Sequence, residues 1–388
     1  MKKRKIAFLI NSLGLGGAER VVSLLLERMK NHPHLEFELI LLENQFFYDT
    51  PKGVKTTVLS KLTWQDSALK RTLFIPILAY KLSRYIKKND ISFVLSFIYR
   101  SDFVNVLASY LSEYKYALSN RVNAGSTYSD NSLTSKINNF LIKKLYSKAP
   151  LIINVSHGVK KDLAKNYNID LKRQKVIYNP YDIKKIEQLS KEPLDLKLIR
   201  EKTIVAVSRL DQVKNIPLLL RSFAKIKEPL TLVIIGEGSQ SDKLKDLACK
   251  LKIDERVVFT GLQNNPYKYM ANASVYISSS NSEGFPNALV EAMICKCAVI
   301  STDCKSGPRE ILAPSSNFDY ELKKGMEFAE YGLLTAVNDQ EAMQEAINFY
   351  LNNEKKRIYY SNHGYKRALD FDLDIIADTY IDIIKREL

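Results

Sequence analysis

The chain has 388 residues, more than a typical single domain, so two domains of roughly 150–200 residues each are expected. Hydrophobic residues make up 46% of the chain and charged residues 26%, which is ordinary for a soluble globular protein. No internal repeat or low-complexity run is visible. Nowhere do about 18 apolar residues follow one another, so a transmembrane helix is not expected.

The formal net charge of +15 is placed unevenly. Residues 1–170 carry 26 Lys and Arg against 13 Asp and Glu, whereas residues 171–388 carry 32 against 30. A basic excess in one half indicates an anionic partner such as phospholipid, nucleic acid or a phosphorylated substrate. A solvated lysine-rich surface would give the same count.

The N-terminus and the cysteines indicate the cellular compartment in which the protein resides. The basic start and the apolar run 6–10 resemble a signal peptide, but Asn11 and Ser12 interrupt the run too early, and a buried strand fits better. We therefore expect a cytoplasmic protein. The four cysteines lack the spacing of a zinc site and are predicted to be reduced structural thiols. They are Cys249, Cys295, Cys297 and Cys304.

Apolar runs alternate with helical patterns along the first half of the chain. Strands are expected at 6–10, 37–43, 92–97 and 151–156, and helices at 18–30, at a long segment before 92 and at 135–148. Such alternation indicates βαβ units and a parallel sheet.

The alternation starts again near residue 180, after a strand and linker at 175–182 that contain Pro180. Strands are then expected at 203–210, 230–238, 257–262, 274–280 and 298–303, helices at 216–226 and 240–251, a surface loop at 314–330 and a helix at 374–388. We therefore predict two doubly wound, Rossmann-like α/β domains that face each other across a cleft. The expected boundaries are 1–178, 179–370 and a final helix at 371–388.

A glycine-rich loop at 11–20 follows the first strand and opens the first helix. Gly14, Gly16 and Gly17 lack a Cβ, so the backbone there can approach a ligand closely. The free N–H groups at the following helix start favour an anion. A plain strand-to-helix turn would also look this way.

Two basic residues, Arg209 and Lys214, lie five positions apart in the first turn of the second domain. Together they could clamp a diphosphate, because Arg supplies a bidentate fork and Lys a mobile point charge. Basic residues in a loop are often simply solvated, so the position in the fold gives this pair its value.

Two carboxylates, Glu283 and Glu291, have seven residues between them and flank a predicted loop-to-helix junction. Carboxylates accept hydrogen bonds from sugar hydroxyls, and the N–H groups of residues 285–289 can receive phosphate oxygens. This combination suits a nucleotide sugar. Taken alone, Glu291 could equally be an ordinary exposed helix residue.

Five segments, GLGGAER, SRLDQVKN, GLQNNPYKYM, EGFPNALVEA and DCKSGPREIL, occur in this order along the chain. In their residues, order and spacing they resemble the retaining GT-B glycosyltransferases of family 4, and the resemblance covers essentially the whole chain. Among these, the chain is most similar to transferases that extend polyprenyl-diphosphate-linked glycans, including bacterial N-acetylgalactosamine transferases.

The resemblance implies roles for individual residues. Arg209 and Lys214 would hold the donor diphosphate, Glu283 would contact the donor hexose, and Glu291 would bind the ribose. Further donor contacts would come from the turn Phe285, Pro286, Asn287, Ala288 and Leu289, from Leu262 and Gln263 beside uracil, and from Gly16 and Gly17 beside the phosphates. The final helix would cross back to the first domain.

The chain departs from the family where many relatives carry a His after a first-domain strand. Here Arg121 and Asn123 occupy that stretch, and Arg121 could hold an acceptor diphosphate. His157 lies in a helix-start segment and is expected to be a capping or surface residue.

The segment 64–88 mixes aromatic and aliphatic residues with Lys and Arg, a pattern that suits an anionic membrane surface. Pro76 should break or kink its helix. A second basic stretch at 136–148 points the same way. An ordinary half-buried helix is the alternative for both segments.

We therefore predict transfer of a hexose or N-acetylhexosamine, first choice N-acetylgalactosamine, from a UDP-sugar to a polyprenyl-diphosphate-linked glycan with anomeric retention. The enzyme would need no metal or other cofactor and would lie on the cytoplasmic face of the inner membrane. Alternatives are a GT-B-like UDP-sugar epimerase and a family 4 transferase with a non-lipid acceptor. A nucleic-acid-binding protein lacks recognisable motifs, and a NAD-dependent oxidoreductase lacks the full glycine fingerprint.

Overall fold

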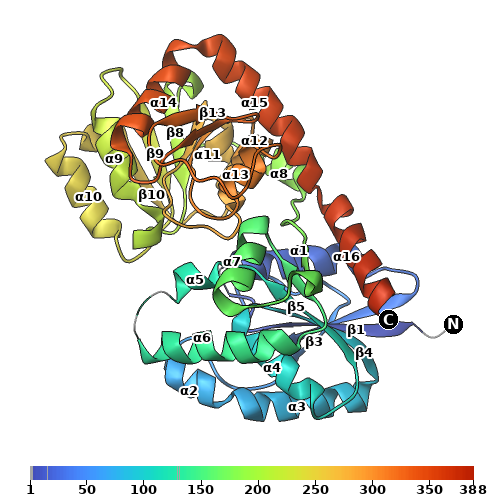
Figure 1. The fold of residues 1–388 in the computed structure, drawn as a ribbon. Helices are drawn as coiled ribbons and strands as arrows, with labels where there is room; N and C mark the ends of the chain where they lie inside the picture. The colour runs from blue at the N-terminus through green and yellow to red at the C-terminus, as the bar shows by residue number, and fades with distance from the viewer. Residues whose placement is uncertain (1–2, 15, 129, 131) are drawn as a thin grey trace. The chain divides into compact units, whose positions relative to one another are not determined.

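The protein is described by a computed structural model that covers residues 3–14, 16–128, 130 and 132–388. It divides into two compact units. The first unit comprises Met1–Pro180 and Leu373–Leu388, and the second comprises Tyr181–Asp372 (Figure 1). The predicted fold class of two Rossmann-like α/β domains is confirmed, because each unit contains its own doubly wound, mainly parallel sheet.

Among the described residues, the first unit has a seven-stranded parallel sheet in the order β3-β2-β1-β4-β5-β6-β7. Its strands are β1 (Arg4–Ile10), β2 (Leu35–Leu41), β3 (Lys55–Val58), β4 (Ile91–Phe97), β5 (Lys115–Asn120), β6 (Ile152–Asn154) and β7 (Gln174–Val176). The central strands β1 and β4 are mainly apolar because helices cover both faces of the sheet.

The helices of the first unit connect these strands, except for the last, which follows the second unit in the chain. They are α1 (Gly17–Met29), α2 (Ala68–Leu73), α3 (Ile75–Asn89), α4 (Tyr99–Ser109), α5 (Ala124–Thr127), α6 (Leu133–Leu145), α7 (His157–Tyr167) and α16 (Leu373–Glu387). As predicted, Pro76 interrupts the segment between β3 and β4: α2 ends at Leu73, and Pro76 occupies the first turn of α3. Proline fits there because its missing N–H would be unpaired in any case.

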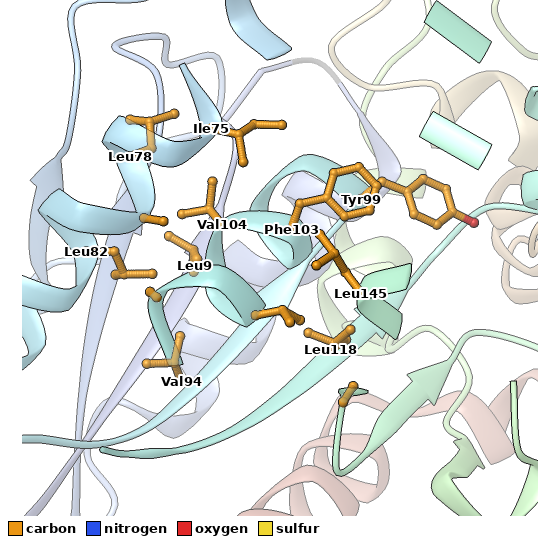
Figure 2. Packing of buried hydrophobic residues seen from close by; sticks show 14 of the residues in the cluster. Leu9, Ile75, Leu78, Leu82, Val94, Tyr99, Phe103, Val104, Leu118 and Leu145 are labelled. Atoms are coloured by element: carbon orange, nitrogen blue, oxygen red, sulfur yellow. The ribbon is translucent and has the colours of Figure 1, made fainter. Parts of the chain in front are cut away.

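The first unit has two cores, one on each face of its sheet. Ala7 and Leu9 of β1 face helices α3, α4 and α6, as Figure 2 shows for the side chains around Leu9. The alternate residues Ile6, Phe8 and Ile10 face α1 and α16. This alternation is the two-residue period of a strand.

The second unit contains, within the described residues, a seven-stranded sheet in the order β10-β9-β8-β11-β12-β14-β13. Its strands are β8 (Thr203–Val207), β9 (Thr231–Ile235), β10 (Val257–Gly261), β11 (Val275–Ser278), β12 (Ala298–Thr302), β13 (Met326–Phe328) and β14 (Leu333–Thr335). Its helices are α8 (Ile183–Ser190), α9 (Ile216–Ala224), α10 (Ser241–Lys250), α11 (Tyr267–Ala271), α12 (Asn287–Ile294), α13 (Pro308–Leu312), α14 (Gln340–Asn352) and α15 (Glu354–Ala368).

Two expectations need correction. The segment 314–330 is not wholly a loop, because β13 forms within it and pairs antiparallel with β14. Gly325, at φ 78°, supplies the left-handed residue that enters β13. All four cysteines are free, but Cys249 is exposed, whereas the other three are buried.

The chain passes between the units twice. Tyr181 and Asp372 pair in an isolated β-bridge beside these two passages. After the second passage, α16 packs against the sheet face that α1 covers, and Arg28 of α1 forms an ion pair with Asp374. The last helix in the sequence thus completes the core of the first unit.

A buried carboxyl group lies beneath the sheet of the first unit. Asp102 of α4 is fully buried and accepts a hydrogen bond of 2.5 Å from the Tyr146 hydroxyl. Burial raises the pKa of Asp102 to about 7. The folded protein therefore holds this proton at pH values where the unfolded chain releases it.

Replacing Asp102 with Asn should flatten the pH dependence of stability. Between about pH 4 and pH 7 the wild-type carboxyl binds its proton only when folded, so it lowers the free energy of unfolding by up to about 1.4 kcal/mol per rising pH unit. The measurement is urea unfolding at about pH 5 and about pH 7. Asp49→Asn, at an exposed position of the same unit, is the control. Parallel wild-type and Asp102→Asn curves would contradict the assignment.

Candidate active site

The switch point of the second sheet lies between β8 and β11. From β8 the chain turns to β9 on one side, whereas β11 pairs with β8 on the other side. In parallel sheets, ligands bind beyond the carboxyl ends of the strands at this point. The loops that follow β8 and β11 carry Lys214 and Glu283.

Lys214 and Glu283 form an ion pair of 2.7 Å between these two loops. Their side chains are only 18% and 11% exposed. Glu283 also accepts a hydrogen bond of 2.6 Å from the Ser280 hydroxyl, and Ser279 donates to the Lys214 carbonyl at 2.9 Å. The structure thus brings one predicted cation and one predicted acid into direct contact.

Arg209 is placed differently from Lys214. Its side chain is 71% exposed and pairs with Asp211 at 3.0 Å. An exposed ion pair contributes little to stability. Arg209 can therefore exchange Asp211 for an incoming anion at small cost.

Glu291 lies within α12 and is only 4% exposed, so it is not the exposed helix residue of the alternative interpretation. The hydroxyl of Tyr276, on β11, lies within electrostatic range of both Glu283 and Glu291. Burial first, and then these two carboxylates, raise the pKa of Tyr276 well above its usual value. Both acids therefore lie close enough to Tyr276 of β11 to influence its hydroxyl.

The turn that opens α12 is held by close contacts. Asn287 accepts a hydrogen bond of 2.7 Å from the Tyr181 hydroxyl, and the Phe285 ring packs edge-on against Phe371 at 5.5 Å. Within the described part of the chain, no side chain caps the start of α12. A Cβ at Gly307, where φ is 93°, would lie 2.5 Å from Pro286 Cδ, so only glycine fits this approach.

The remaining turn residues also lie at this edge. Ala288 is partly buried and Leu289 fully buried, so any contact from Leu289 to a ligand would come from its backbone. After β10, Leu262 is 46% exposed, and the Gln263 amide donates to the Thr260 carbonyl at 2.9 Å. The loop after β10 thus offers an apolar side chain at the same sheet edge.

Sequence reasoning missed the role of two glycines after β9. A Cβ at Gly236 would lie 1.9 Å from the Ser208 carbonyl oxygen, and one at Gly238 would lie 2.4 Å from that of Leu210. These glycines let the loop after β9 pack directly on the turn that carries Arg209. The GEG signal at 236–238 was present in the sequence.

A buried charge network was also missed. Arg309, 6% exposed, forms ion pairs with Asp303 at 2.6 Å and Glu327 at 2.8 Å. It fixes the segment 303–309, and with it Gly307, against the start of α12. The acids come from 303 and from β13, whose existence the sequence did not indicate.

Gly16 and Gly17 belong to the first unit, and the neighbouring Leu15 lies outside the described residues. A Cβ at Gly16 would lie 2.2 Å from a carboxylate oxygen of Glu19, so this side chain folds back over the helix start. Burial raises the pKa of Glu19 above its usual value. The assignment of both glycines to the donor phosphates stays a prediction.

Arg121 is 7% exposed and lies between β5 and α16. It donates hydrogen bonds of 2.6 Å to Asn179 and to the Tyr380 hydroxyl. These contacts hold the Arg121 side chain within the first unit, and its role in binding the acceptor stays a prediction.

Asn123 is 6% exposed, and its carbonyl accepts a hydrogen bond of 2.8 Å from the Thr127 hydroxyl. His157 is the first residue of α7 and is exposed, so the surface expectation is confirmed, whereas Ser156 provides the cap.

Replacing Arg309 with Met should lower the free energy of unfolding by about 3–5 kcal/mol, because Asp303 would remain as a buried, unpaired charge. The measurement is urea unfolding followed by circular dichroism. Lys323→Met removes an exposed pair with Glu321 and should cost less than about 1 kcal/mol. Equal losses in the two variants would contradict this account of the network.

Comparison with known proteins shows the family and the fold of the chain. Residues 15–185 match the family described as Glycosyltransferase Family 4, and residues 190–367 match the Glycosyl transferases group 1 family. In fold, the chain is similar to an Anabaena HepE structure in complex with UDP-glucose, with a TM-score of 0.77, 19% identity and 98% and 99% of the two chains covered.

One curated relative matches nearly the whole length of the chain, and another matches less than half of it. The chain is 35% identical, over 96% of its own length and 97% of the relative's, to the N-acetylgalactosamine-N,N'-diacetylbacillosaminyl-diphospho-undecaprenol 4-alpha-N-acetylgalactosaminyltransferase of Campylobacter jejuni. It is also 32% identical to a Salmonella typhimurium lipopolysaccharide 1,6-galactosyltransferase, over 42% and 45% of the two chains. With two doubly wound units and a full-length relative, the chain belongs to the family 4 glycosyltransferases of the GT-B fold and is a hexosyltransferase.

Proposed function

We propose that the enzyme transfers N-acetylgalactosamine from a UDP-sugar to a polyprenyl-diphosphate-linked glycan and retains the anomeric configuration. The observation that carries this proposal is the 35% identity over 96% of the chain with the Campylobacter jejuni transferase. Two other relatives from that organism, 22% and 24% identical, are also N-acetylgalactosaminyltransferases whose names contain diphospho-undecaprenol or PP-undecaprenol.

The donor would lie at the switch point of the second sheet. Its diphosphate would replace Glu283 as the partner of Lys214 and would attract the exposed Arg209. Released from Lys214, Glu283 would accept a hydrogen bond from a sugar hydroxyl, and Glu291 one from the ribose. This exchange of partners is supported by the 2.7 Å pair between Lys214 and Glu283, which keeps the ammonium group beside the switch point.

The reaction would proceed on one face of the sugar. The acceptor oxygen forms a bond to the anomeric carbon while the bond from that carbon to the diphosphate oxygen breaks. The acceptor proton passes to the leaving diphosphate. Lys214 and Arg209 would stabilise the charge that develops on that leaving group, which is an electrostatic form of catalysis.

A metal requirement is not part of this proposal. Within the described residues, no group of three or more His, Cys, Asp and Glu side chains is placed to hold a metal ion. We propose that Lys214 and Arg209 balance the diphosphate charge instead, so that activity survives treatment with a chelator.

We further propose that the first unit docks on the cytoplasmic face of the inner membrane. None of the described helices is both long and apolar enough to span a bilayer. The docking face is formed by α2, α3, α6 and the segment before α2. Its exposed apolar side chains are Trp64, Leu69, Leu73, Ile77, Tyr80, Leu133 and Phe140. Its exposed cations include Lys70, Lys81, Arg84, Lys136, Lys143 and Lys144. This combination suits an anionic lipid surface.

Incubation with single UDP-sugars and a diphosphate-linked glycan tests the function. N-acetylgalactosamine should be transferred in preference to glucose, galactose and N-acetylglucosamine, with or without chelator. Without an acceptor, an epimerase would isomerise the sugar, and that result would overturn the proposal.

Lys214→Ala should lower kcat by about 100-fold or more, as loss of a main charge-stabilising group does. Full turnover by this variant would contradict the diphosphate assignment.

Flotation with vesicles tests the docking face. Binding should require anionic lipid and weaken with salt. Replacing Leu69 and Leu73 together with Glu should weaken it by about tenfold or more, because each buried Leu contributes about 1.5–3 kcal/mol. Ile199→Glu, at an exposed position of the second unit, is the control. Equal retention on neutral and anionic vesicles would contradict the proposal.

A further inference from the structure

A second charged cluster lies at the switch point of the first sheet, which falls between β1 and β4. Glu43 follows β2, and its N–H donates to the carbonyl of Asn11, which follows β1. Arg100 is the second residue of α4, directly after β4. Arg71 comes from α2. The cluster therefore occupies the position where an α/β sheet binds its ligand.

Both arginines approach the same carboxylate oxygen. Arg100 lies 2.6 Å and Arg71 3.8 Å from Glu43 Oε1. Glu43 is 3% exposed, whereas Arg100 is 14% and Arg71 29% exposed. The carboxylate is thus the most buried group of the cluster, and the two guanidinium groups lie between it and solvent.

One carboxylate does not satisfy these two cations. Among the described residues, the buried Nε atoms of Arg71 and Arg100 have no hydrogen-bond partner, and Glu43 Oε1 meets both arginines as an ion pair without a hydrogen bond. Burial lowers the pKa of Arg100, the Glu43 carboxylate partly offsets that effect, and the positive charge of Arg71 makes a smaller lowering contribution. Leaving buried donors unpaired is costly, so a second anion would stabilise the cluster.

The local backbone and the helix positions favour a ligand here. Ile98, at the end of β4, has φ 74°, which is strained for a β-branched residue. This residue sets the start of the helix that carries Arg100. On α2, Leu69 and Leu73 share one exposed face and are 53% and 66% exposed, whereas Arg71 lies on the opposite face of the helix. The helix therefore carries both part of the docking face and a cation of the cluster.

We propose that Arg71 and Arg100 bind the diphosphate of the lipid-linked acceptor and that Glu43 holds them in place when the acceptor is absent. This inference rests on the proposed function, which supplies a diphosphate at the membrane surface. A guanidinium fork matches two phosphate oxygens, and two such forks match a diphosphate. The apolar side chains of α2 would meet the membrane beside the bound head group.

Steady-state kinetics of the full-length enzyme tests the site. At saturating UDP-sugar, Arg71→Gln and Arg100→Gln should each raise the KM for a diphosphate-linked acceptor by about tenfold or more, as expected for a lost charged hydrogen bond. The KM for the UDP-sugar should stay unchanged. Arg173→Gln is the control, since it removes the same charge from an exposed position of the first unit.

Glu43→Gln separates ligand binding from a structural role. Without the competing carboxylate, both arginines turn to the ligand, so the acceptor KM should fall. If the ion pair were purely structural, all three variants would have a lower free energy of unfolding, and the acceptor KM would stay unchanged. An unchanged KM in both Arg71→Gln and Glu43→Gln would overturn the proposal, even if Arg100→Gln does not fold.

A binding measurement keeps the site testable apart from transfer. With saturating UDP on the donor site, calorimetry should detect farnesyl diphosphate but not farnesol, with weaker binding to Arg71→Gln and tighter binding to Glu43→Gln. Tighter binding of farnesyl diphosphate than of inorganic pyrophosphate would support a lipid source. Equal binding of farnesyl diphosphate to all variants would overturn the site. A wild-type enzyme that binds farnesyl diphosphate in this pattern but transfers no sugar would refute the proposed function alone.

Discussion

The direction of the strands governs both units of this enzyme. The carboxyl ends of parallel strands lie along one edge of the sheet. At one point along that edge, the order in which the chain adds strands changes direction. Lys214 and Glu283 meet at this point in the second unit, and Glu43 and Arg100 meet there in the first. Residues far apart in the sequence become neighbours because each follows a strand of the same sheet.

Both clusters handle charge in the same way. A cation that is mostly shielded from water needs a partner, since an unpaired buried charge is strongly destabilising. Glu283 supplies that partner for Lys214, and Glu43 supplies it for Arg100. A phosphate that enters either cluster would replace an existing partner, so the basic side chains need no large rearrangement to receive it.

The two α/β units, and the loops that carry Lys214 and Glu283, could be predicted from the sequence because strand patterns and short motifs are local. The sequence could not predict that Glu19 folds over Gly16, or that Arg121 packs between β5 and α16, since those contacts depend on tertiary packing. β13 was missed because three residues show no clear period. Arg309 lies in the segment DCKSGPREIL, but its partner Glu327 could be identified only once β13 was known.

The placement of α16 has a consequence for synthesis of the protein. This helix follows the second unit in the chain, yet Ile376, Tyr380 and Ile384 belong to the core of the first unit. During translation, domains generally fold from the N-terminus as they emerge. Here the first unit must wait, with one face of its sheet partly uncovered, until α16 has been synthesised and has left the ribosome. Nascent chains stalled before residue 373 would therefore expose apolar surface that a chaperone could bind.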